Sequence, residues 1–442
     1  MEESKIKLLE LVRRISESKN EPEWMLEIRL AALNSYLEMP DLSWGPDLSS
    51  LNTDEIIYYS DPEVKESNNW QDLPLEISET FEKLGIPDAE KKYLGGVGAQ
   101  YDSNMVYHRI LESLAAQGVI FENMDSALQK YPELVKEYFA KCIKFNEHKY
   151  IALHYAFWSG GTFIYVPANV KVKMPLQAYF RMNKEKGAQF EHTIIIADVG
   201  SEVEYIEGCS APKYNYSSLH AGGVEIFVKD YAKVKYSSIE NWSKNVYNLN
   251  TKKAIVNKSA EIDWLGGNLG SKVTMLYPTS VLMGDNSKSS MLGIVLASDG
   301  QVQDTGAKVI HIGKNTSSII KSKSISKDGG ITNYRGFVQT LKGADNAFSI
   351  VDCDGLILDS QSVSNTWPSN KIESINATIL HEARLGKISD EHIFYLGMYG
   401  FSESDAKNLI AGGYLGQISK RLPIEYAVEL RRLIDLELND RI

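Results

Sequence analysis

The chain has 442 residues, of which 43% are hydrophobic, so it is long enough to bury a large core. Its 58 acidic and 47 basic side chains give a net charge of -11, which argues against nucleic-acid binding, because phosphates are bound by clustered positive charge. No apolar stretch approaches the roughly 20 residues that a membrane-spanning helix needs, and the first residues carry acids rather than an apolar signal core. We therefore expect a cytoplasmic protein with no nucleic-acid or membrane partner.

Residues 1–155 are predicted to form an N-terminal cap of helices and mixed αβ structure. Apolar residues recur at near-helical spacing over 6–15 and again over 24–37, where a proline follows the second pattern. Further along, 94–98 is glycine-rich and predicts a turn, and 104–119 predicts a helix.

Residues 156–383 have a different pattern, in which apolar and polar residues alternate and β-branched and aromatic residues are frequent. Such alternation predicts strands. A short turn of a small residue, a charged residue and an apolar residue recurs at irregular intervals. The turns are Ser201-Glu-Val203, Ala232-Lys-Val234, Ala260-Glu-Ile262 and Ser271-Lys-Val273. Repetition of this kind favours a β-solenoid, in which each coil covers the next, and a β-sandwich is the alternative.

Residues 384–442 return to helical patterns. One helix is predicted to begin after Ser389 and to end at Gly400, and the next is predicted to begin at Ser402 or Ser404. A last helix is predicted to begin at Pro423, with an apolar face that packs either on the solenoid or on a partner.

Three cysteines occur, at Cys142, Cys209 and Cys353, and none belongs to a CxxC pair. The chain therefore does not encode a four-cysteine zinc or ferredoxin-type site, and so few cysteines in a cytoplasmic protein argue against structural disulfides. The alternation places Cys353 on the same strand face as Val351, which in a solenoid points inward. Filling the core is the alternative role for each thiol.

The neighbouring His381 and Glu382 lie where the strand pattern gives way to helix. Imidazole and carboxylate groups both bind iron, but neighbours on a strand point to opposite faces unless a bulge redirects one of them. Helix capping and packing are the alternative roles. His192, His220 and His311 lack ligand-like spacing and are expected to be ordinary residues, and no glycine-rich segment fits the phosphate-binding pattern GxxxxGK[ST].

Several longer motifs occur in a fixed order along the chain. They are EPEWMLEIRLAALNSYLEMPDLSWGPDL, YIEGCSAP, YPTSVLMGDNS, DTGAKVIHIGKNT, NYRGFVQ, CDGLIL and HEARLGKISDEHIFYL. Over nearly its whole length the chain resembles the SufB/SufD family of the SUF system for iron–sulfur cluster assembly. The first motif and the cysteine positions resemble the SufB branch, because SufD generally lacks them. This resemblance implies a right-handed parallel β-helix with an N-terminal α/β cap and a C-terminal helical region.

The resemblance implies a scaffold, without enzyme activity of its own, on which a transient iron–sulfur cluster is built and then passed to apo-proteins. Implied partners are the ATPase SufC, bound through residues 384–442, SufD or a second copy of this chain, and a cysteine desulfurase that supplies persulfide sulfur. Reduced flavin (FADH2) is associated with such complexes. The alternative within the family is a structural, SufD-like partner of SufC without a cluster. A polysaccharide lyase or hydrolase would need an exposed acidic cluster, which the sequence does not show.

The same resemblance implies roles for particular residues. Cys209 matches the cysteine that accepts sulfur, and Cys353 matches the cysteine that holds the nascent cluster. His381 and Glu382 match the assisting metal ligands.

A further group matches positions that line a path between the two cysteines. It consists of Arg181, Asn183, Trp242 and Lys252. Glu240 stands where the family often has glutamine, and an acid there would repel a persulfide anion, whereas Cys142 matches no role.

Overall fold

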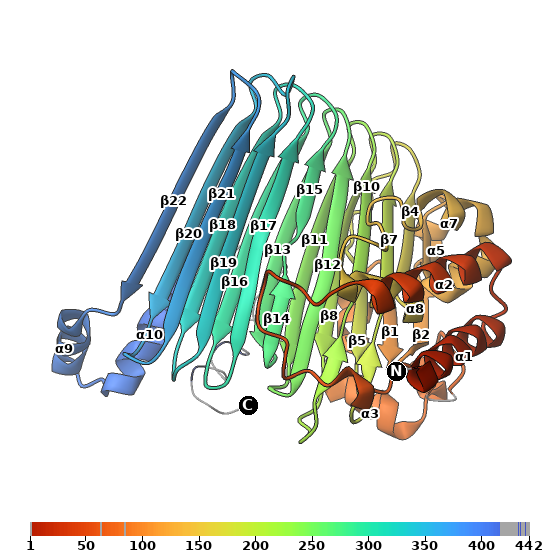
Figure 1. Cartoon of the computed structure of the whole chain (residues 1–442), viewed down its shortest axis with the longest axis horizontal. Helices are drawn as coiled ribbons and strands as arrows, with labels where there is room; N and C mark the ends of the chain where they lie inside the picture. Colours follow the sequence, from red (N-terminus) through yellow and green to blue (C-terminus); the bar gives the residue numbers. More distant parts are fainter. Residues whose placement is uncertain are drawn as a thin grey trace.

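The computed structural model describes residues 2–61, 64–83 and 85–415, together with Arg432, Ile434 and Leu438. Within them the chain forms a parallel β-solenoid of about 8 turns with helices at both ends (Figure 1). The prediction of a β-solenoid is confirmed. A β-sandwich is excluded because nearly all neighbouring strands are parallel and belong to successive coils.

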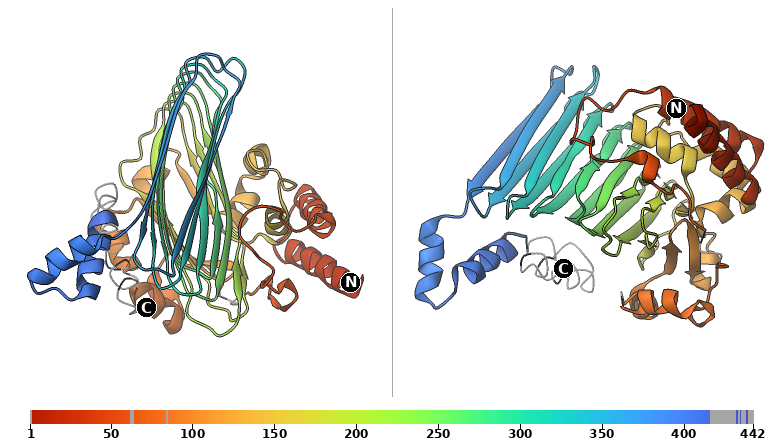
Figure 2. Two further views of the ribbon diagram at one scale, coloured as in Figure 1. Left: turned by 60° about the vertical axis from the view of Figure 1, so that its left-hand side comes forward. Right: turned by 60° about the horizontal axis from the view of Figure 1, so that its bottom comes forward.

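The solenoid is flattened, so that two sheets face each other across a thin core (Figure 2, left). The first sheet has the spatial order β2 (Asn104–Ile110), β1 (Gly96–Tyr101), β5 (Leu176–Arg181), β8 (Glu202–Ser210), β11 (Lys233–Trp242), β13 (Glu261–Gly270), β16 (Lys288–Ala297), β18 (Ser317–Ser326), β20 (Phe348–Ile357), β22 (Thr378–Lys387). The second has the order β21 (Val363–Ile372), β19 (Ile331–Thr340), β17 (Val302–His311), β14 (Val273–Leu276), β12 (Val246–Val256), β10 (Gly223–Val228), β7 (His192–Ala197), β4 (Thr162–Val166), β3 (Ile120–Asn123). Three short strands pair beside it: β6 (Ala188–Gln189), β9 (Ser218–His220) and β15 (Thr279–Leu282).

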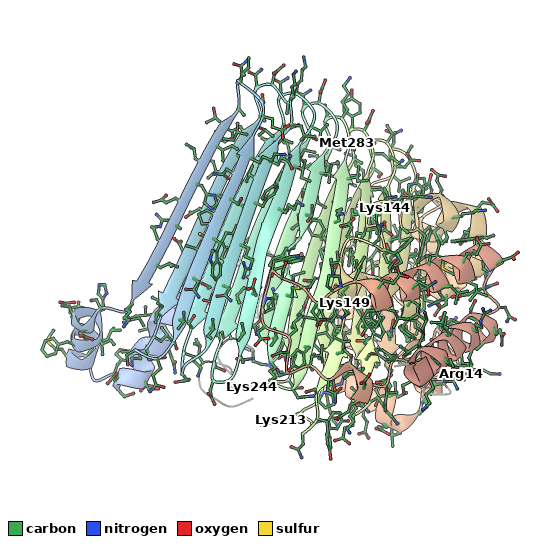
Figure 3. The ribbon with its side chains drawn as sticks, viewed as in Figure 1. Arg14, Lys144, Lys149, Lys213, Lys244 and Met283 are labelled. Carbon is green, nitrogen blue, oxygen red and sulfur yellow. The ribbon has the colours of Figure 1, made fainter. Side chains whose placement is uncertain are left out.

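The coils stack in register because equivalent corners use residues that tolerate a left-handed backbone. Asn286, Asn315 and Asn346 have φ values of 61°, 54° and 58° at the same corner of successive coils. The Asn346 amide also donates to the Asn315 side-chain oxygen at 3.0 Å. Figure 3 shows Met283 among the turns along the upper edge, and Lys213 and Lys244 near the opposite edge.

The N-terminal helices pack on the outer face of the second sheet near its N-terminal end and against β1 and β2 of the first sheet (Figure 1). They are α1 (Glu2–Ser18), α2 (Glu23–Glu38), α3 (Leu75–Lys83), α4 (Ile86–Tyr93), α5 (Glu112–Ala115), α6 (Met124–Lys130), α7 (Pro132–Tyr138) and α8 (Lys149–Phe157), with 3-10 turns at Thr53–Glu55 and Trp70–Asp72. α2 is held to the end of α8 by Arg29, which donates to the Trp158 carbonyl at 3.0 Å and pairs with Glu21 at 2.6 Å. Both charged side chains of this pair are buried.

Two local predictions for the N-terminal region are wrong. The glycine-rich segment 94–98 runs into strand β1 rather than forming a turn, and the first half of 104–119 is strand β2. Gly96 is needed for close packing, since a Cβ on it would lie 2.9 Å from the Phe121 ring. The pairing of β1 with β2 and β5 therefore determines that these segments are strands, although the apolar residues of 104–119 have helical spacing.

The C-terminal helices lie on the other side of the solenoid from α1 and α2 (Figure 2, left). α9 (Asp390–Met398) is capped by Ser389, and α10 (Glu403–Leu415) begins after Ser402, whose oxygen accepts from the Asp405 amide at 3.1 Å. Ala411 and Leu415 of α10 belong to a buried cluster on the outer face of the first sheet. The helix predicted from Pro423 lies outside the described residues. None of the described helices combines the length and the apolar character that spanning a membrane requires.

Candidate functional site

Charged side chains fill the interior of the coils around Cys209. β8 supplies Glu207 and Cys209, β11 supplies Glu240 and β12 supplies Lys252. All four are buried, and Cys209 is only 1% exposed. Burying a charged group is costly unless it is paired with an opposite charge, so the partners of each charged group in this cluster matter.

Lys252 is the centre of the interior network. Its Nζ donates to Glu240 Oε1 at 2.8 Å, to Ser238 Oγ at 3.1 Å and to Glu207 Oε1 at 3.2 Å. The second oxygen of Glu240 accepts from Asn248 Nδ2 at 2.5 Å. The positive charge of Lys252 thus compensates the negative charge of Glu240. The repulsion of a persulfide anion that the sequence led us to expect from Glu240 is reduced accordingly.

The pKa values of the two carboxylates, Glu240 and Glu207, are shifted in opposite directions. Burial acts to raise the pKa of Glu240, but the charges of Lys252 and His220 and the hydrogen bonds from Lys252 and Asn248 together outweigh burial and hold the pKa at about 2. Burial raises the pKa of Glu207, which is farther from Lys252. Burial likewise raises the pKa of the Cys209 thiol well above its ordinary value, and the surrounding carboxylates raise it further. Cys209 is therefore a protonated thiol unless a cation or metal stabilises the thiolate.

His220 is the site residue that the sequence prediction missed. His220 Nε2 lies 2.5 Å from Glu191 Oε1, and Nδ1 lies 2.8 Å from Asn248 Oδ1. Ligand atoms of Glu191, Cys209 and His220 all lie within 4.8 Å of one another, and the three residues are buried. Burial acts to lower the pKa of His220, but the charges of Glu191 and Glu240 and the hydrogen bonds with Glu191 and Asn248 together outweigh burial and raise the pKa. The expectation that His220 is an ordinary residue did not anticipate this grouping with Glu191 and Cys209.

The predicted lining residues lie at different depths. The Trp242 ring lies on the His220 ring with centroids 4.3 Å apart, so Trp242 joins Lys252 in the buried cluster. Arg181 is half-buried and donates to Ser210 Oγ at 3.0 Å, one residue beyond Cys209. Asn183 is half-buried in the segment after β5, where its carbonyl accepts from the Tyr214 hydroxyl at 2.7 Å.

A narrow interior cavity of about 50 Å³ extends from this cluster towards the C-terminal coils. Tyr236 and Lys252 line one part of it, and Ser322 and Tyr334 line another. A cavity of this size holds a few water molecules, since each needs about 10–15 Å³.

The cavity exists because small residues stack in register through the middle coils. Ser238 pairs with Gly266, Gly266 with Gly293, Gly293 with Ser322, and Ser322 with Cys353. A Cβ added at either glycine would meet nothing within 4 Å. A column without large side chains thus leads from the Lys252 network towards Cys353.

Cys353 lies on the inner face of β20 and is 3% exposed. Its Sγ contacts Thr366 Oγ1 at 3.4 Å and donates to the Glu382 carbonyl at 3.6 Å. Burial raises the pKa of this thiol, while the Thr366 hydrogen bond lowers it. The predicted shared inner face of Cys353 and Val351 is confirmed.

His381 and Glu382 point to opposite faces of β22. His381 pairs in register with Val351 and lies beside Gly336 on the inner face, where burial lowers its pKa. Neither of its shielded ring nitrogens has a hydrogen-bond partner among the described residues. Glu382 is exposed on the outer face and lies 3.4 Å from Arg384. Of the two predicted ligands, the His381 side chain therefore lies in the interior near Cys353. Glu382 contacts Cys353 only through its backbone carbonyl, and its side chain lies outside.

Comparisons with known proteins agree with this architecture. A model of the SUF system FeS cluster assembly SufBD core domain matches residues 180–414, and one of the SufBD protein N-terminal region matches residues 61–178. Iron-sulfur cluster assembly SufBD family proteins of Staphylococcus haemolyticus (strain JCSC1435) and Staphylococcus aureus (strain MRSA252) are each 51% identical over 432 residues, covering 98% of this chain and 93% of each relative. The chain belongs to the SufBD family of iron–sulfur cluster assembly proteins.

Proposed function

We propose that the chain is the SufB-type scaffold of its family, on which iron and sulfur are joined into a cluster. The observation that carries this proposal is the column of small residues through the solenoid, which leads from the cluster around Cys209 to Cys353 near the last coil. A structural partner without a cluster would have no need for a cavity between two buried thiols.

Sulfur arrives at Cys209 as a persulfide from a desulfurase. A persulfide anion inside a protein needs compensating positive charge, because desolvation disfavours the charged form. Lys252 supplies that charge within the cluster, and His220, whose pKa is raised, supplies more when it is protonated. A two-electron reductant, for which reduced flavin is the candidate, then cleaves the S–S bond, which leaves the thiolate on Cys209 and releases hydrosulfide. The hydrosulfide passes along the cavity to Cys353.

Iron and sulfur meet at Cys353, with His381 as the second ligand from the inner face. Glu382 joins the ligand set if the last coil rearranges when a partner covers it. A thiolate with nitrogen or oxygen ligands holds iron less firmly than four thiolates do. Such incomplete ligation suits a scaffold, because the cluster must leave for an apo-protein.

Two surfaces are available for the partners that the scaffold requires. α9 has no buried residue and carries exposed Phe394 and Met398, so we propose that it contacts the ATPase SufC. The open end of the solenoid at β21 and β22 is proposed to receive SufD or a second copy of this chain.

The test is anaerobic cluster assembly with two sulfur sources. The purified chain and its partners receive iron together with either a desulfurase and cysteine or free sulfide, and cluster formation is followed by sulfur-to-iron charge-transfer absorption. We expect Cys353→Ser to lose the cluster with both sources. Gly293→Leu fills the cavity, and we expect it to lose the cluster with the desulfurase only.

Two controls make the result specific. Cys142→Ser removes a thiol that donates to the Lys253 carbonyl, and it should leave both reactions unchanged. Gly293→Ala adds one carbon to open space and should slow the desulfurase reaction less than leucine does. A full cluster yield from Cys353→Ser would overturn the scaffold assignment and favour a structural role. Full activity of a folded Gly293→Leu variant with the desulfurase would overturn the interior path.

A further inference from the structure

Three potential metal ligands meet at a second place, away from Cys353. Glu191 lies in the connection between β6 and β7, Cys209 lies in β8, and His220 ends β9. Their ligand atoms lie within 4.8 Å of one another. A carboxylate oxygen, a thiolate and an imidazole nitrogen form a donor set that suits zinc and iron(II).

The hydrogen bonds around His220 orient it as a ligand. Nδ1 faces the Asn248 side-chain oxygen at 2.8 Å, so this nitrogen carries a proton and donates it. Metal-bound histidines are usually held in this way, with the second nitrogen turned towards the metal. Here Nε2 faces Glu191 Oε1 at 2.5 Å, where one proton now joins the two groups. A metal ion would take the place of that proton.

Glu191 has an oxygen available for this change. Its Oε2 is buried and has no hydrogen-bond partner among the described residues. The whole residue is 2% exposed, so water does not compensate for the missing partner. An unpartnered carboxylate oxygen at such a depth is costly, and a cation beside it removes the cost.

The balance of buried charge is compatible with such an ion. Glu191, Glu207 and Glu240 bring three carboxylates into one cluster, against the single ammonium of Lys252. The proton that Glu191 and His220 share compensates one carboxylate and Lys252 compensates another, so one negative charge remains. A divalent cation in place of that proton adds one positive charge, which a water molecule in the same position would not do.

We propose that Glu191, Cys209 and His220 bind a divalent transition-metal ion of the zinc and iron(II) class, at a site separate from Cys353. This inference goes beyond the scaffold role. One consequence links the two: the ion holds the Cys209 thiolate, so the metal and incoming sulfur compete for the same atom. The loop that follows β8 has exposed residues such as Lys213, so solvent lies a few residues from the site.

Cobalt(II) is the probe, because it occupies zinc sites and its bond to a thiolate gives a charge-transfer absorption. The full chain is treated with a chelator, dialysed and titrated with cobalt(II) alone. We expect a thiolate-to-cobalt band that saturates and a rise in the thermal unfolding midpoint, since an ion that binds only the folded state stabilises it. In a Cys353→Ser background, which removes the thiol of the other proposed metal centre, Cys209→Ser should abolish the band, and His220→Gln should weaken binding at least tenfold.

Matched thiol variants decide where the cobalt binds. Cys353→Ser and Cys142→Ser should keep the band and the stabilisation. If the band survives when both Cys209 and Cys353 are changed to serine, disappears in Cys353→Ser alone, or never forms in the wild-type chain, the proposed site is wrong. Should Cys209→Ser fail to fold, Glu191→Gln serves as the second variant, and unchanged cobalt affinity in it would equally refute the site. The desulfurase experiment is independent, so either proposal can fail alone.

Discussion

Lys252 shows how much depends on single charges inside the solenoid. Its ammonium is 2% exposed and holds two buried carboxylates, Glu207 and Glu240. A buried ion pair adds little to the free energy of unfolding compared with apolar residues in place of both partners. Removing only one partner is costly, because the other charge is then buried without compensation. The cluster is therefore sensitive to single substitutions.

We predict that Lys252→Met lowers the free energy of unfolding by about 3–5 kcal/mol, because two carboxylates then lose their cation. Lys235→Met is the control. Lys235 pairs with Glu204 at 2.8 Å on the half-exposed outer face, and its loss should cost less than about 1 kcal/mol. Urea unfolding followed by circular dichroism measures both. Equal losses in the two variants would contradict the buried network.

The same network predicts a pH dependence. The pKa of Glu240 is about 2 in the fold, below its ordinary 4.5, so its ionised form stabilises the fold above pH 4.5. This contribution disappears as the pH falls towards 2. The difference in stability between wild type and Lys252→Met should therefore shrink over that range, and a constant difference would show that Glu240 does not depend on Lys252.

At the scale of single residues, the sequence predicts the strand face on which a side chain lies better than it predicts the residues that this side chain contacts. The alternation was sufficient to place Cys353 beside Val351 on the inner face, because period two follows from strand geometry. His220 could not be recognised, since Glu191 approaches it from the connection between β6 and β7 and Cys209 from β8, rather than at a motif spacing. The signal that could have found it is the length of a coil, which brings β6 beside β9.

At the scale of elements, the C-terminal helices differ in what they bury. α10 buries Ala406, Ala411 and Leu415, whereas α9 buries nothing although it carries four large apolar side chains. Phe394 is 71% exposed and Met398 is 62% exposed. Exposed apolar side chains grouped on one helix are typical of a binding surface.

We predict that Phe394→Ser with Met398→Ser weakens SufC binding at least tenfold, because burial of each side chain in an interface contributes about 1.5–3 kcal/mol. The control is Leu409→Ser on α10, which is 52% exposed and lies outside the surface of α9. Titration calorimetry with SufC measures the affinity, and the thermal midpoint should not change in either variant. Normal SufC affinity in the double variant would exclude α9 as the contact.

Element types were predictable where many coils repeat and unpredictable where one hairpin stands alone. The repeated turns before β8, β11, β13 and β14 indicated the solenoid because each coil confirms the next. β2 has helical spacing in its sequence but lies against β1, so only the tertiary pairing reveals it as a strand.

At the scale of the whole molecule, the two ends of the solenoid are treated differently. Helices and the β1–β2 hairpin cover the N-terminal end (Figure 2, right), whereas β21 and β22 end the two sheets without a further strand among the described residues. Ile372 belongs to the inner face of β21, yet it is 54% exposed. An inner-face apolar residue in solvent, beside two open strand edges, is typical of a surface that binds another chain.

We predict that this end forms the contact with a second copy of the chain or with SufD, and that Ile372→Lys abolishes it. A lysine at this position would place an unpaired charge in the covered surface, which is costly. The control is Ile6→Lys on α1, which is 52% exposed at the opposite end and should not affect association. Light scattering measures the mass of each variant alone and with SufD. If the wild-type chain stays monomeric in both conditions, or if Ile372→Lys associates normally, the open end is not the contact. Because Cys353 and His381 lie on the last two coils of the first sheet, loss of this contact should also lower cluster yield while leaving SufC binding intact.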